Sequence, residues 1–576
     1  MFNKNKFSQC FAFILLTGSY LVPLAMAAPQ DSASNAEASR FEKETKEQSA
    51  AANRRALLPS EAIPTEKAPE EKGAPDLSFT LTALAVKGST VFDDKDFRPI
   101  YGPYLGKRVT KKELDEIVSQ LKALYDKNGY VTTIVYIPEQ EVANGKFEIV
   151  AAEGRMGELR IEGARSFSSE LIQRYFHQAK NKILNLVAVQ RDIMRLNQNP
   201  DLSVKAVLSG GKEPQTSDVT LKVTDRFPWH FGAGWNNRGT RLLGKQRELV
   251  YARSTNVTGR NDTFFANTGI GTWSIGEGLI YECPVTTYGT KLGFSYTYFG
   301  MRMGKEFKAL KERGGTHVFS PSVSQEMFLS ETFQLDADAG FDIKSIRRFA
   351  DDTVSSNDQI RLPYFGFELT SQDSLFGGGQ FIYNPKFVFG TDSFLGGSKW
   401  ASDKISRVQT GGDFFKYQQK LNRIQAMPFH SQLAVNTGAQ LTPDTLPYSE
   451  QMTLGGMSSV RGYPEGDYSA DTAVEVNAEW SFPSYFIPPD WRLPFADKSL
   501  RDSIQPIIFV DYDYGRLNTV NPGERASKNL LGAGGGFKIS FLKNVFARFE
   551  WAKALGDKPT SNAGPSTFYF SVQSEI

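Results

Sequence analysis

The chain has 576 residues, 66 of them Lys or Arg and 64 Asp or Glu, so its formal net charge at pH 7 is only +2. This balance excludes a nucleic-acid binder that relies on overall basicity, and 23% charged with 12% aromatic residues exclude wholesale disorder. The two cysteines, Cys10 and Cys283, are too few for a disulfide framework or a cysteine-rich zinc site.

Residues 1–27 have the pattern of a secretory signal peptide. Two lysines precede an uncharged run that ends in Ala25-Met26-Ala27, a small-x-small cleavage pattern. The alternative is a membrane anchor helix, but the apolar run is short and is interrupted by a glycine and a proline. No later segment approaches the ~18 uninterrupted apolar residues of a spanning helix. We therefore expect an exported mature chain without a transmembrane helix.

Two polar segments follow the signal. Residues 28–58 are rich in Ala, Glu, Lys, Arg and Gln, which are mostly good helix formers. They are interpreted either as a disordered tail or as a single polar helix that docks at a polar site. Residues 59–76 contain four prolines and predict an extended linker.

Residues 77–154 and 155–226 predict two small α+β modules with the same order of elements. In the first, a Thr110-Lys111-Lys112-Glu113 capping box opens a helix with apolar residues at helical spacing, and two strands follow before residue 152. The second carries a strand, helices at 169–178 and 188–197, and two strands before residue 224. A β-α-α-β-β order that recurs at about 75-residue spacing indicates an internal repeat.

Residues 227–576 change to strands with one apolar and one polar face. Val474, Val476, Ala478 and Trp480 alternate with Glu475, Asn477 and Glu479, and the same period recurs near 292–298, 547–551 and 568–572. The segments are near ten residues long, as tilted membrane-crossing strands require. A soluble β-sandwich also alternates, but this region is long for a single sandwich. We therefore expect a mainly β fold with a transmembrane β-barrel whose charged face lines a wet lumen.

Sequence motifs of common enzymes are missing. None of the four histidines forms a His-Glu-x-x-His pattern, and neither a Gly-x-Ser-x-Gly elbow nor a Walker-type loop is present. The glycine-rich run at 532–536 resembles a phosphate loop superficially, but strand sequence follows it, and close packing explains it better. Cys283 lacks a partner histidine and is interpreted as a structural thiol. The sequence predicts no enzyme, no cofactor and no metal site.

Residues 455–463, Gly-Gly-Met-Ser-Ser-Val-Arg-Gly-Tyr, resemble the lumen-loop motif of the outer-membrane superfamily that couples periplasmic POTRA domains to a barrel. Residues 191–200 resemble the second helix of that superfamily's second POTRA domain, and residues 232–239 resemble its first barrel strand and turn. Segment 28–58 matches the position of a plug helix. Within the superfamily the chain is similar to two-partner secretion transporters of the TpsB type, the haemolysin activation/secretion family.

The resemblance implies a 16-stranded transmembrane β-barrel at 227–576, with a lumen loop near 455–468, preceded by POTRA domains at 77–154 and 155–226. It implies an outer-membrane location in a Gram-negative bacterium, with the POTRA domains in the periplasm. The implied function is secretion of a specific exported partner polypeptide, such as an adhesin or haemolysin, with activation of that partner left open. Other implied partners are outer-membrane lipid and the general barrel-assembly machinery. We expect a monomer that binds no nucleic acid.

The resemblance also implies that Val460, Arg461, Gly462 and Tyr463 fold back into the lumen. A carboxylate on the barrel wall is expected to hold the Arg461 guanidinium through a forked hydrogen bond; the alternative is a surface arginine in a glycine-rich turn. The family's Phe-x-Asp-x-Gly strand motif is matched imperfectly, so Asp511, Asp513 and the displaced Gly515 all remain candidates. The family's Gly-Asp-x-Gly is replaced by Ala-Asp-Thr-Ala at 470–473.

The passenger polypeptide is expected to add as a strand to an exposed POTRA sheet edge. The candidate edge residues are Thr133, Ile134, Val135, Tyr136, Leu202 and Val204, with ordinary core packing as the alternative for each. Segment 32–58 would occupy the lumen at rest and leave it during transport.

Three rival functions remain open at this point. An outer-membrane assembly insertase of the same superfamily usually carries more POTRA domains. A passive porin would not need the modules or the Arg461 loop. A lipase or protease fused to a barrel is not supported by any catalytic motif in the sequence. The role of the long insertion at 484–504 is left open.

Overall fold

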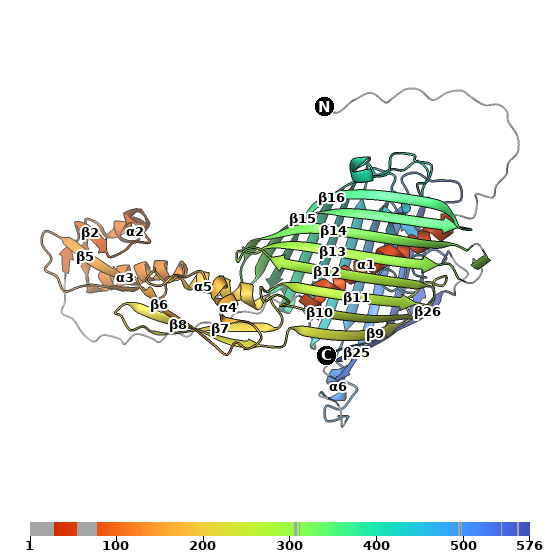
Figure 1. The fold of residues 1–576 in the computed structure, drawn as a ribbon. Coiled ribbons are helices and arrows are strands. Elements are labelled where there is room, and N and C mark those ends of the chain that lie inside the picture. The colour runs from red at the N-terminus through yellow and green to blue at the C-terminus, as the bar shows by residue number, and fades with distance from the viewer. Residues whose placement is uncertain are drawn as a thin grey trace.

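The structure is a computed structural model. It describes residues 28–53, 78–304, 308–309, 311–493, 496, 498–542, 544–560 and 564–576. The predicted signal peptide at 1–27 and the predicted linker at 59–76 lie outside these residues. Two small modules lead along the chain into one large barrel (Figure 1).

The first module packs two helices beside a three-stranded sheet. Its elements are β1 (Ser78–Thr80), β2 (Ala83–Lys87), α2 (Asp94–Tyr101), a 3₁₀ turn η2 (Gly102–Tyr104), β3 (Arg108–Thr110), α3 (Lys111–Lys127), β4 (Ile134–Tyr136) and β5 (Lys146–Ala152). The predicted capping box is present, with Thr110 and Glu113 each accepting from the other's backbone at the start of α3. The sheet order is β2-β5-β4, so β4 is an edge strand.

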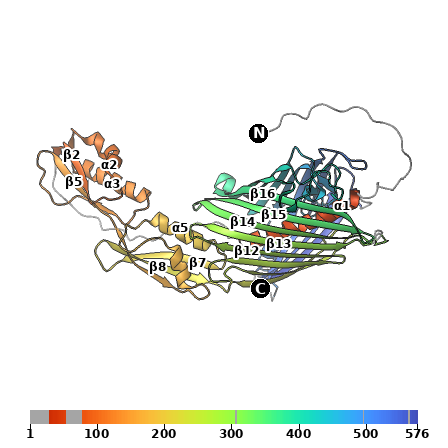
Figure 2. The same ribbon diagram turned by 45° about the horizontal axis from the view of Figure 1, so that its top comes forward.

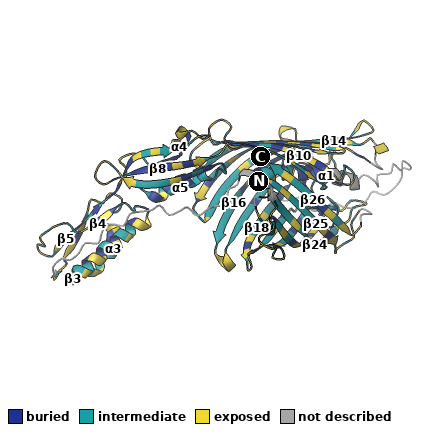
Figure 3. Ribbon diagram, turned by 90° about the horizontal axis from the view of Figure 1, so that it is seen from below, coloured by how far each residue is buried: buried dark blue, intermediate teal, exposed yellow. Residues whose placement is uncertain are grey.

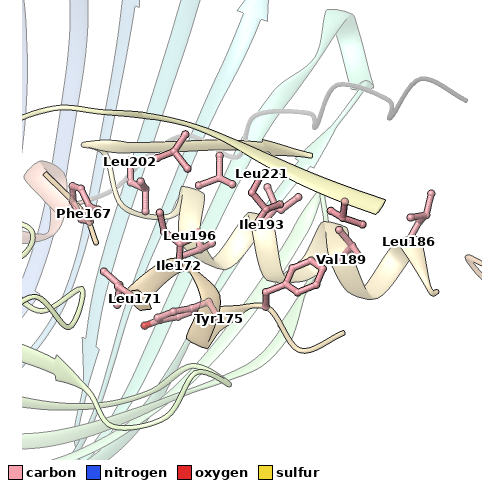
Figure 4. Packing of buried hydrophobic residues seen from close by; sticks show 14 of the residues in the cluster. Phe167, Leu171, Ile172, Tyr175, Leu186, Val189, Ile193, Leu196, Leu202 and Leu221 are labelled. Atoms are coloured by element: carbon pink, nitrogen blue, oxygen red, sulfur yellow. The ribbon is translucent and has the colours of Figure 1, made fainter. Parts of the chain in front are cut away.

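The second module repeats this arrangement. Its elements are β6 (Arg155–Glu162), α4 (Ser169–Tyr175), α5 (Leu186–Asn197), β7 (Leu202–Gly210) and β8 (Thr216–Asp225). In the three-stranded sheet of each module the first strand (β2 or β6) is parallel to the last (β5 or β8), and the second strand (β4 or β7) is antiparallel to it, so the predicted β-α-α-β-β repeat is confirmed. Helix α4 ends three residues earlier than predicted because the backbone of Phe176 is extended. Figure 4 shows the apolar core between the two helices and the sheet.

Sixteen strands of the described chain form one closed antiparallel barrel, as predicted. They are β9 (Trp229–Asn236), β10 (Arg247–Ser254), β11 (Thr263–Gly271), β12 (Ser274–Pro284), β13 (Thr290–Arg302), β14 (Arg313–Leu329), β15 (Phe333–Ala350), β16 (Thr353–Asp373), β17 (Gly379–Phe389), β18 (Phe415–Met427), β19 (Ser431–Leu441), β22 (Thr472–Ser481), β23 (Ile504–Arg516), β24 (Ser527–Leu542), β25 (Val545–Ala554) and β26 (Ser566–Glu575). The smaller elements are η4 (Leu375–Gly377), η5 (Phe394–Gly396), η6 (Tyr448–Glu450), β20 (Met452–Leu454), β21 (Tyr468–Ala470) and α6 (Leu500–Ser503).

Several barrel strands are longer than the sequence pattern predicts. Strands β14, β15 and β16 have 17, 18 and 21 residues, whereas a tilted strand needs about 9–11 residues to cross a bilayer. The expectation of segments near ten residues is therefore wrong for this part of the wall. The extra length carries charged and polar side chains such as Arg347, Arg348 and Asn357, which suit water beyond the membrane.

The path of the chain fixes which turns share an end of the barrel. Strand β9 begins directly after the second module, and successive strands are antiparallel. The turns β10–β11, β12–β13, β14–β15, β16–β17, β18–β19, β22–β23 and β24–β25 therefore all lie at the end next to the second module, here called the module end. Burial alternates along the wall strands (Figure 3), with Val474 and Trp480 exposed on the outer face and Glu475 buried on the lumen side.

Helix α1 (Ala28–Asn53) lies inside the barrel, where it runs along the lumen in two different views (Figures 1 and 2). It packs against β11, β12 and β13 and against η6. Of the two interpretations of segment 28–58, the polar helix is the one observed for residues 28–53. Within the described ranges no helix is long and apolar enough to cross a membrane.

Candidate functional site

The connection from β19 to β22 folds back into the lumen. Strands β20 and β21 pair as a small hairpin, and the segment between them, residues 455–467, forms the lumen loop. Gly455, Gly456 and Gly462 have φ of +90°, +103° and +100°, a region that favours glycine. A Cβ on Gly462 would also lie only 2.7 Å from the backbone nitrogen of Ala554. The glycines of the predicted motif are therefore required by the backbone path and by close contact with the wall.

Arg461 is held by a forked contact with the barrel wall. Its Nε lies 2.7 Å from Asp511 Oδ2 and its Nη2 lies 2.8 Å from Asp511 Oδ1, while its backbone N–H donates to the same carboxylate at 3.1 Å. The guanidinium also stacks on the Phe509 ring at 3.4 Å from the centroid. Both ionic side chains are almost fully buried. The interaction has the planar, two-point geometry that arginine provides and lysine cannot.

Further charged side chains of the wall complete a balanced cluster around Arg461. Its Nη1 lies 2.8 Å from Glu479 and 3.2 Å from Glu550. Arg548 pairs with both of these carboxylates, and Lys538 lies 2.7 Å from Glu479. The cations Arg461, Arg548 and Lys538 thus match the anions Asp511, Glu479 and Glu550. Removing one of its buried members, such as Arg461 or Asp511, leaves an uncompensated charge.

The other candidate residues on β23 have different neighbours. Asp513 accepts from the Ser459 hydroxyl of the lumen loop, so it contacts the loop but not the Arg461 guanidinium. Gly515 lies against Leu454 and Ala470, where a Cβ would come within 2.5 Å of Leu454. The structure therefore brings Asp511, Asp513 and Gly515 together along one lumen-facing row, and it pairs Asp511 with Arg461.

The rest of the motif is packed against the last strands of the barrel. Val460 and Tyr463 are fully buried. The Gly462 N–H donates to the Tyr569 hydroxyl at 3.1 Å, and that hydroxyl donates to the Tyr463 carbonyl at 3.1 Å. In the glycine-rich run, a Cβ on Gly532 would lie 2.0 Å from the Arg461 carbonyl oxygen. This run therefore lets the loop backbone touch the wall.

Helix α1 is anchored in the lumen by one buried ring. Phe41 is 1% exposed and lies against Gly269 and Gly276, where a Cβ would come within 3.0 and 2.7 Å of its ring. On the next turn of the helix, Thr45 lies against Gly278, where a Cβ would come within 2.5 Å of the threonine side chain. These three lumen-facing glycines of β11 and β12 form a groove for the helix, here called the glycine groove.

Ala38 joins Phe41 in an apolar cluster with Leu243, Phe299 and Met301, and other contacts of α1 are polar. Arg40 pairs with Glu465 of the lumen loop at 2.6 Å, and Glu44 pairs with Arg247 of β10 at 3.1 Å. Near the end of the helix, Glu47 pairs with Lys420 at 2.7 Å, and both of these side chains are about half exposed. Helix and lumen loop thus fill the lumen as neighbours, joined by the Arg40–Glu465 pair.

A second buried arginine closes the opposite end of the barrel, and the sequence analysis missed it. Arg407, in the β17–β18 connection, is fully buried and pairs with Asp471 at 2.8 Å and Glu524 at 3.1 Å. It also donates to the carbonyls of Leu446 and Thr519. Three long connections meet on this one side chain. Arg407 lies in a connection without periodicity. The one clue in the sequence is its partner Asp471, the aspartate that is kept where Ala-Asp-Thr-Ala replaces the family's Gly-Asp-x-Gly at 470–473.

The predicted passenger-binding residues lie on or next to two edge strands. In β4, Ile134 and Tyr136 are exposed, whereas Val135 and the preceding Thr133 are buried. In β7, Leu202 and Val204 belong to the apolar core of the second module. Of the six candidates, Ile134 and Tyr136 present side chains to solvent, and core packing accounts for the side chains of the others.

Polar contacts connect the second module to the module end of the barrel, another feature that the sequence analysis missed. Asn199 donates to the Thr255 carbonyl at 2.9 Å, and His177 Nε2 lies 2.8 Å from the Thr287 hydroxyl. Arg195 pairs with Glu326 at 2.8 Å. Two of the three barrel residues belong to the turns β10–β11 and β12–β13, and Glu326 lies beside the turn β14–β15.

Two family models match this chain. A model described as haemolysin secretion/activation protein ShlB/FhaC/HecB matches residues 215–539, more than half of the chain. A model of the POTRA domain, ShlB-type, matches residues 79–154, the first module.

Individual relatives are similar over most of the length. Heme/hemopexin transporter protein HuxB of Haemophilus influenzae is 21% identical over 507 residues, which cover 86% of this chain and 87% of that protein. Outer membrane transporter CdiB of Escherichia coli O6:K15:H31 (strain 536 / UPEC) is 23% identical over 481 residues, with 82% and 80% covered. The solved structure of CdiB from Escherichia coli has a TM-score of 0.75 at 21% identity, covering 96% of this chain and 100% of that chain. It shares the fold.

Proposed function

Because the chain belongs to the ShlB/FhaC/HecB family of haemolysin secretion/activation proteins, we propose that the lumen loop and helix α1 have different roles inside its barrel. The chain is an outer-membrane transporter of the two-partner secretion type, with its POTRA domains in the periplasm, and it secretes a partner polypeptide. The proposal concerns how the lumen is closed and opened. The lumen loop stays anchored through Arg461, and α1 is the removable plug.

The observation that carries this proposal is the Arg461–Asp511 fork. A guanidinium held at 2.7 and 2.8 Å by a buried carboxylate is costly to separate. By contrast, α1 meets the wall through one buried ring and several separate polar pairs, of which the Glu47–Lys420 pair is half exposed. Exposed pairs contribute little, so the helix is the part that can leave.

The passenger is received in the periplasm as an unfolded chain. Strand addition to β4 of the first POTRA domain is supported by its edge position and by the exposed side chains of Ile134 and Tyr136. The β7 edge of the second domain offers backbone groups in the same way. The passenger is a large exported protein of the adhesin or haemolysin kind, and its folding outside the cell supplies the driving force. The transporter works as a monomer that the general barrel-assembly machinery inserts.

A comparison of a deletion strain with its parent tests this function. Proteomes of culture supernatant and outer membrane are measured in both strains, and in the deletion strain complemented with the parent gene. We expect one large protein to vanish from the supernatant while other outer-membrane barrels keep their levels. A joint fall of many barrels would instead identify an assembly insertase, and no change in either fraction would overturn the proposal.

Deletion of residues 32–58 tests the plug. The shortened protein should show a higher ion conductance than the parent in planar bilayers, because α1 no longer fills the lumen. An unchanged conductance would rule out the plug while leaving the transport function itself intact.

A further inference from the structure

The module end of the barrel has two unlike parts. The second module, here also called POTRA2 as the first is called POTRA1, contacts barrel residues in or beside the turns β10–β11, β12–β13 and β14–β15 through Asn199, His177 and Arg195. The turns that continue around the barrel, β16–β17, β18–β19 and β22–β23, carry large exposed aromatic side chains. One part of the rim is therefore held to the second module by polar contacts, and the other part presents exposed rings.

The second part exposes aromatic rings on three neighbouring turns. Phe376 on β16–β17 is 87% exposed, Phe429 on β18–β19 is 83% exposed and Phe486 on β22–β23 is 71% exposed. Trp491 and Tyr485 on the same β22–β23 turn are also exposed. Single exposed apolar residues are common, but exposed rings gathered on neighbouring turns mark a binding surface. These five residues are here called the apolar rim.

Hydrogen bonds organise the β22–β23 turn that carries three of these rings. The Tyr485 hydroxyl donates to the Phe429 carbonyl at 2.6 Å, which ties two neighbouring turns together. Arg501, in α6, donates to the Ile487 carbonyl at 2.7 Å, and the Ser484 hydroxyl donates to the Ile504 carbonyl at 2.5 Å. The exposure of Phe486 and its neighbours therefore belongs to a folded, hydrogen-bonded turn.

The apolar rim continues the lipid-facing surface of the barrel. On the outer face of β22, Val474 and Trp480 point away from the lumen, opposite Glu475 and Glu479. Phe482 follows in the same alternation, and its ring lies 4.9 Å from Trp480. The row of apolar groups thus passes from the wall directly into the turn. In Figure 1, α6 projects to the side of the barrel instead of along the strands.

We propose that the apolar rim is a membrane anchor that lies in the headgroup region of the periplasmic leaflet of the outer membrane. Aromatic side chains, and Trp and Tyr in particular, are favoured at that depth because the ring contacts acyl chains while the O–H or N–H group contacts headgroups and water. Continuity with the lipid-facing wall selects lipid as the occupant over an exported polypeptide. The insertion at 484–504 thereby has a role, which is to hold the barrel in the leaflet on the part of the rim that presents exposed rings.

Lipid contact at this turn can be measured directly. Full-length protein with Cys283→Ser and Phe486→Cys is labelled with an environment-sensitive fluorophore and reconstituted in phosphatidylcholine vesicles, with or without bromine on the acyl chains. Val510→Cys, on the outer face of β23, is the matched control for lipid contact. Ile134→Cys, on the exposed edge of POTRA1, is the matched control for water contact. Each variant is first checked for a folded barrel by its heat-dependent mobility on a gel.

We expect the label at position 486 to be quenched by brominated lipid clearly more than the label at 134, at a level approaching that at 510. If the label at 486 is quenched no more than the label at 134, the proposal is overturned. That result is expected if the apolar rim binds an exported polypeptide instead of lipid. Trp491→Cys replaces Phe486→Cys if the latter does not fold. Since no passenger takes part, this result is independent of the proposed plug and of secretion.

Discussion

The lumen loop and helix α1 occupy the same lumen but are held in opposite ways. Around Arg461 the charges are buried, balanced and locked by a fork, and glycines at 462 and 532 bring backbone against backbone. Along α1, a single ring fits a groove, and the polar pairs become more exposed toward the helix end. The part of the lumen that we propose to be permanent and the part that we propose to be removable are thus built from similar residue types and differ in burial and geometry.

The largest effect is expected at the buried fork. Arg461→Ala leaves Asp511 as an uncompensated buried charge, which costs about 3–5 kcal/mol in comparable cases. Heat-dependent gel mobility should show the barrel unfolding at a lower temperature, and secretion of the passenger should fall steeply. Arg461→Lys keeps the charge but loses the forked hydrogen bond, so its unfolding temperature and its secretion should lie between those of the parent and of Arg461→Ala. Normal secretion by Arg461→Lys would mean that the fork is not needed.

A smaller loss is expected at the second buried arginine. Arg407→Met removes the ion pair with Asp471, but that carboxylate keeps donors from the Leu446 and Asn518 backbones and from Gln451. We therefore expect a loss of about 2–3 kcal/mol, below that of Arg461→Ala. The same gel assay measures it. A larger loss than at Arg461 would show that the outer connections, and not the lumen loop, form the permanent part.

Removal of the one buried ring of α1 should loosen the plug. Phe41→Ala removes the group that fills the glycine groove, and truncation of a buried Phe costs about 3–5 kcal/mol. The barrel itself should keep its heat stability, while planar-bilayer recordings should show more frequent openings than in the parent. Unchanged openings would indicate that the polar pairs alone keep α1 in place.

The exposed pair at the helix end should matter least. Glu47→Gln breaks a contact with Lys420 in which both side chains are half exposed, and such pairs contribute about 0–1 kcal/mol. Conductance and secretion should remain close to those of the parent. A strong increase in openings would instead show that a solvated ion pair keeps α1 in the lumen.

The sequence pattern predicts the barrel and the repeat well because both depend on local periodicity. Alternation at 474–480 directly marks the lumen and lipid faces, and the capping box at Thr110 marks the start of α3. The choice between Asp511 and Asp513 could not be predicted, since both face the lumen two residues apart and the depth of the loop decides between them. Arg407 and the groove for Phe41 depend on contacts between distant segments, which no local pattern records.

The glycine groove has a consequence for the passage of a polypeptide. If α1 leaves the lumen as proposed, the wall at Gly269, Gly276 and Gly278 exposes backbone, with the side chains of Asn267 and Arg247 beside it. The three glycines offer a translocating segment no side chain that could select one residue type over another. The groove that holds the plug would then also be a stretch of wall with little preference for the sequence that passes it.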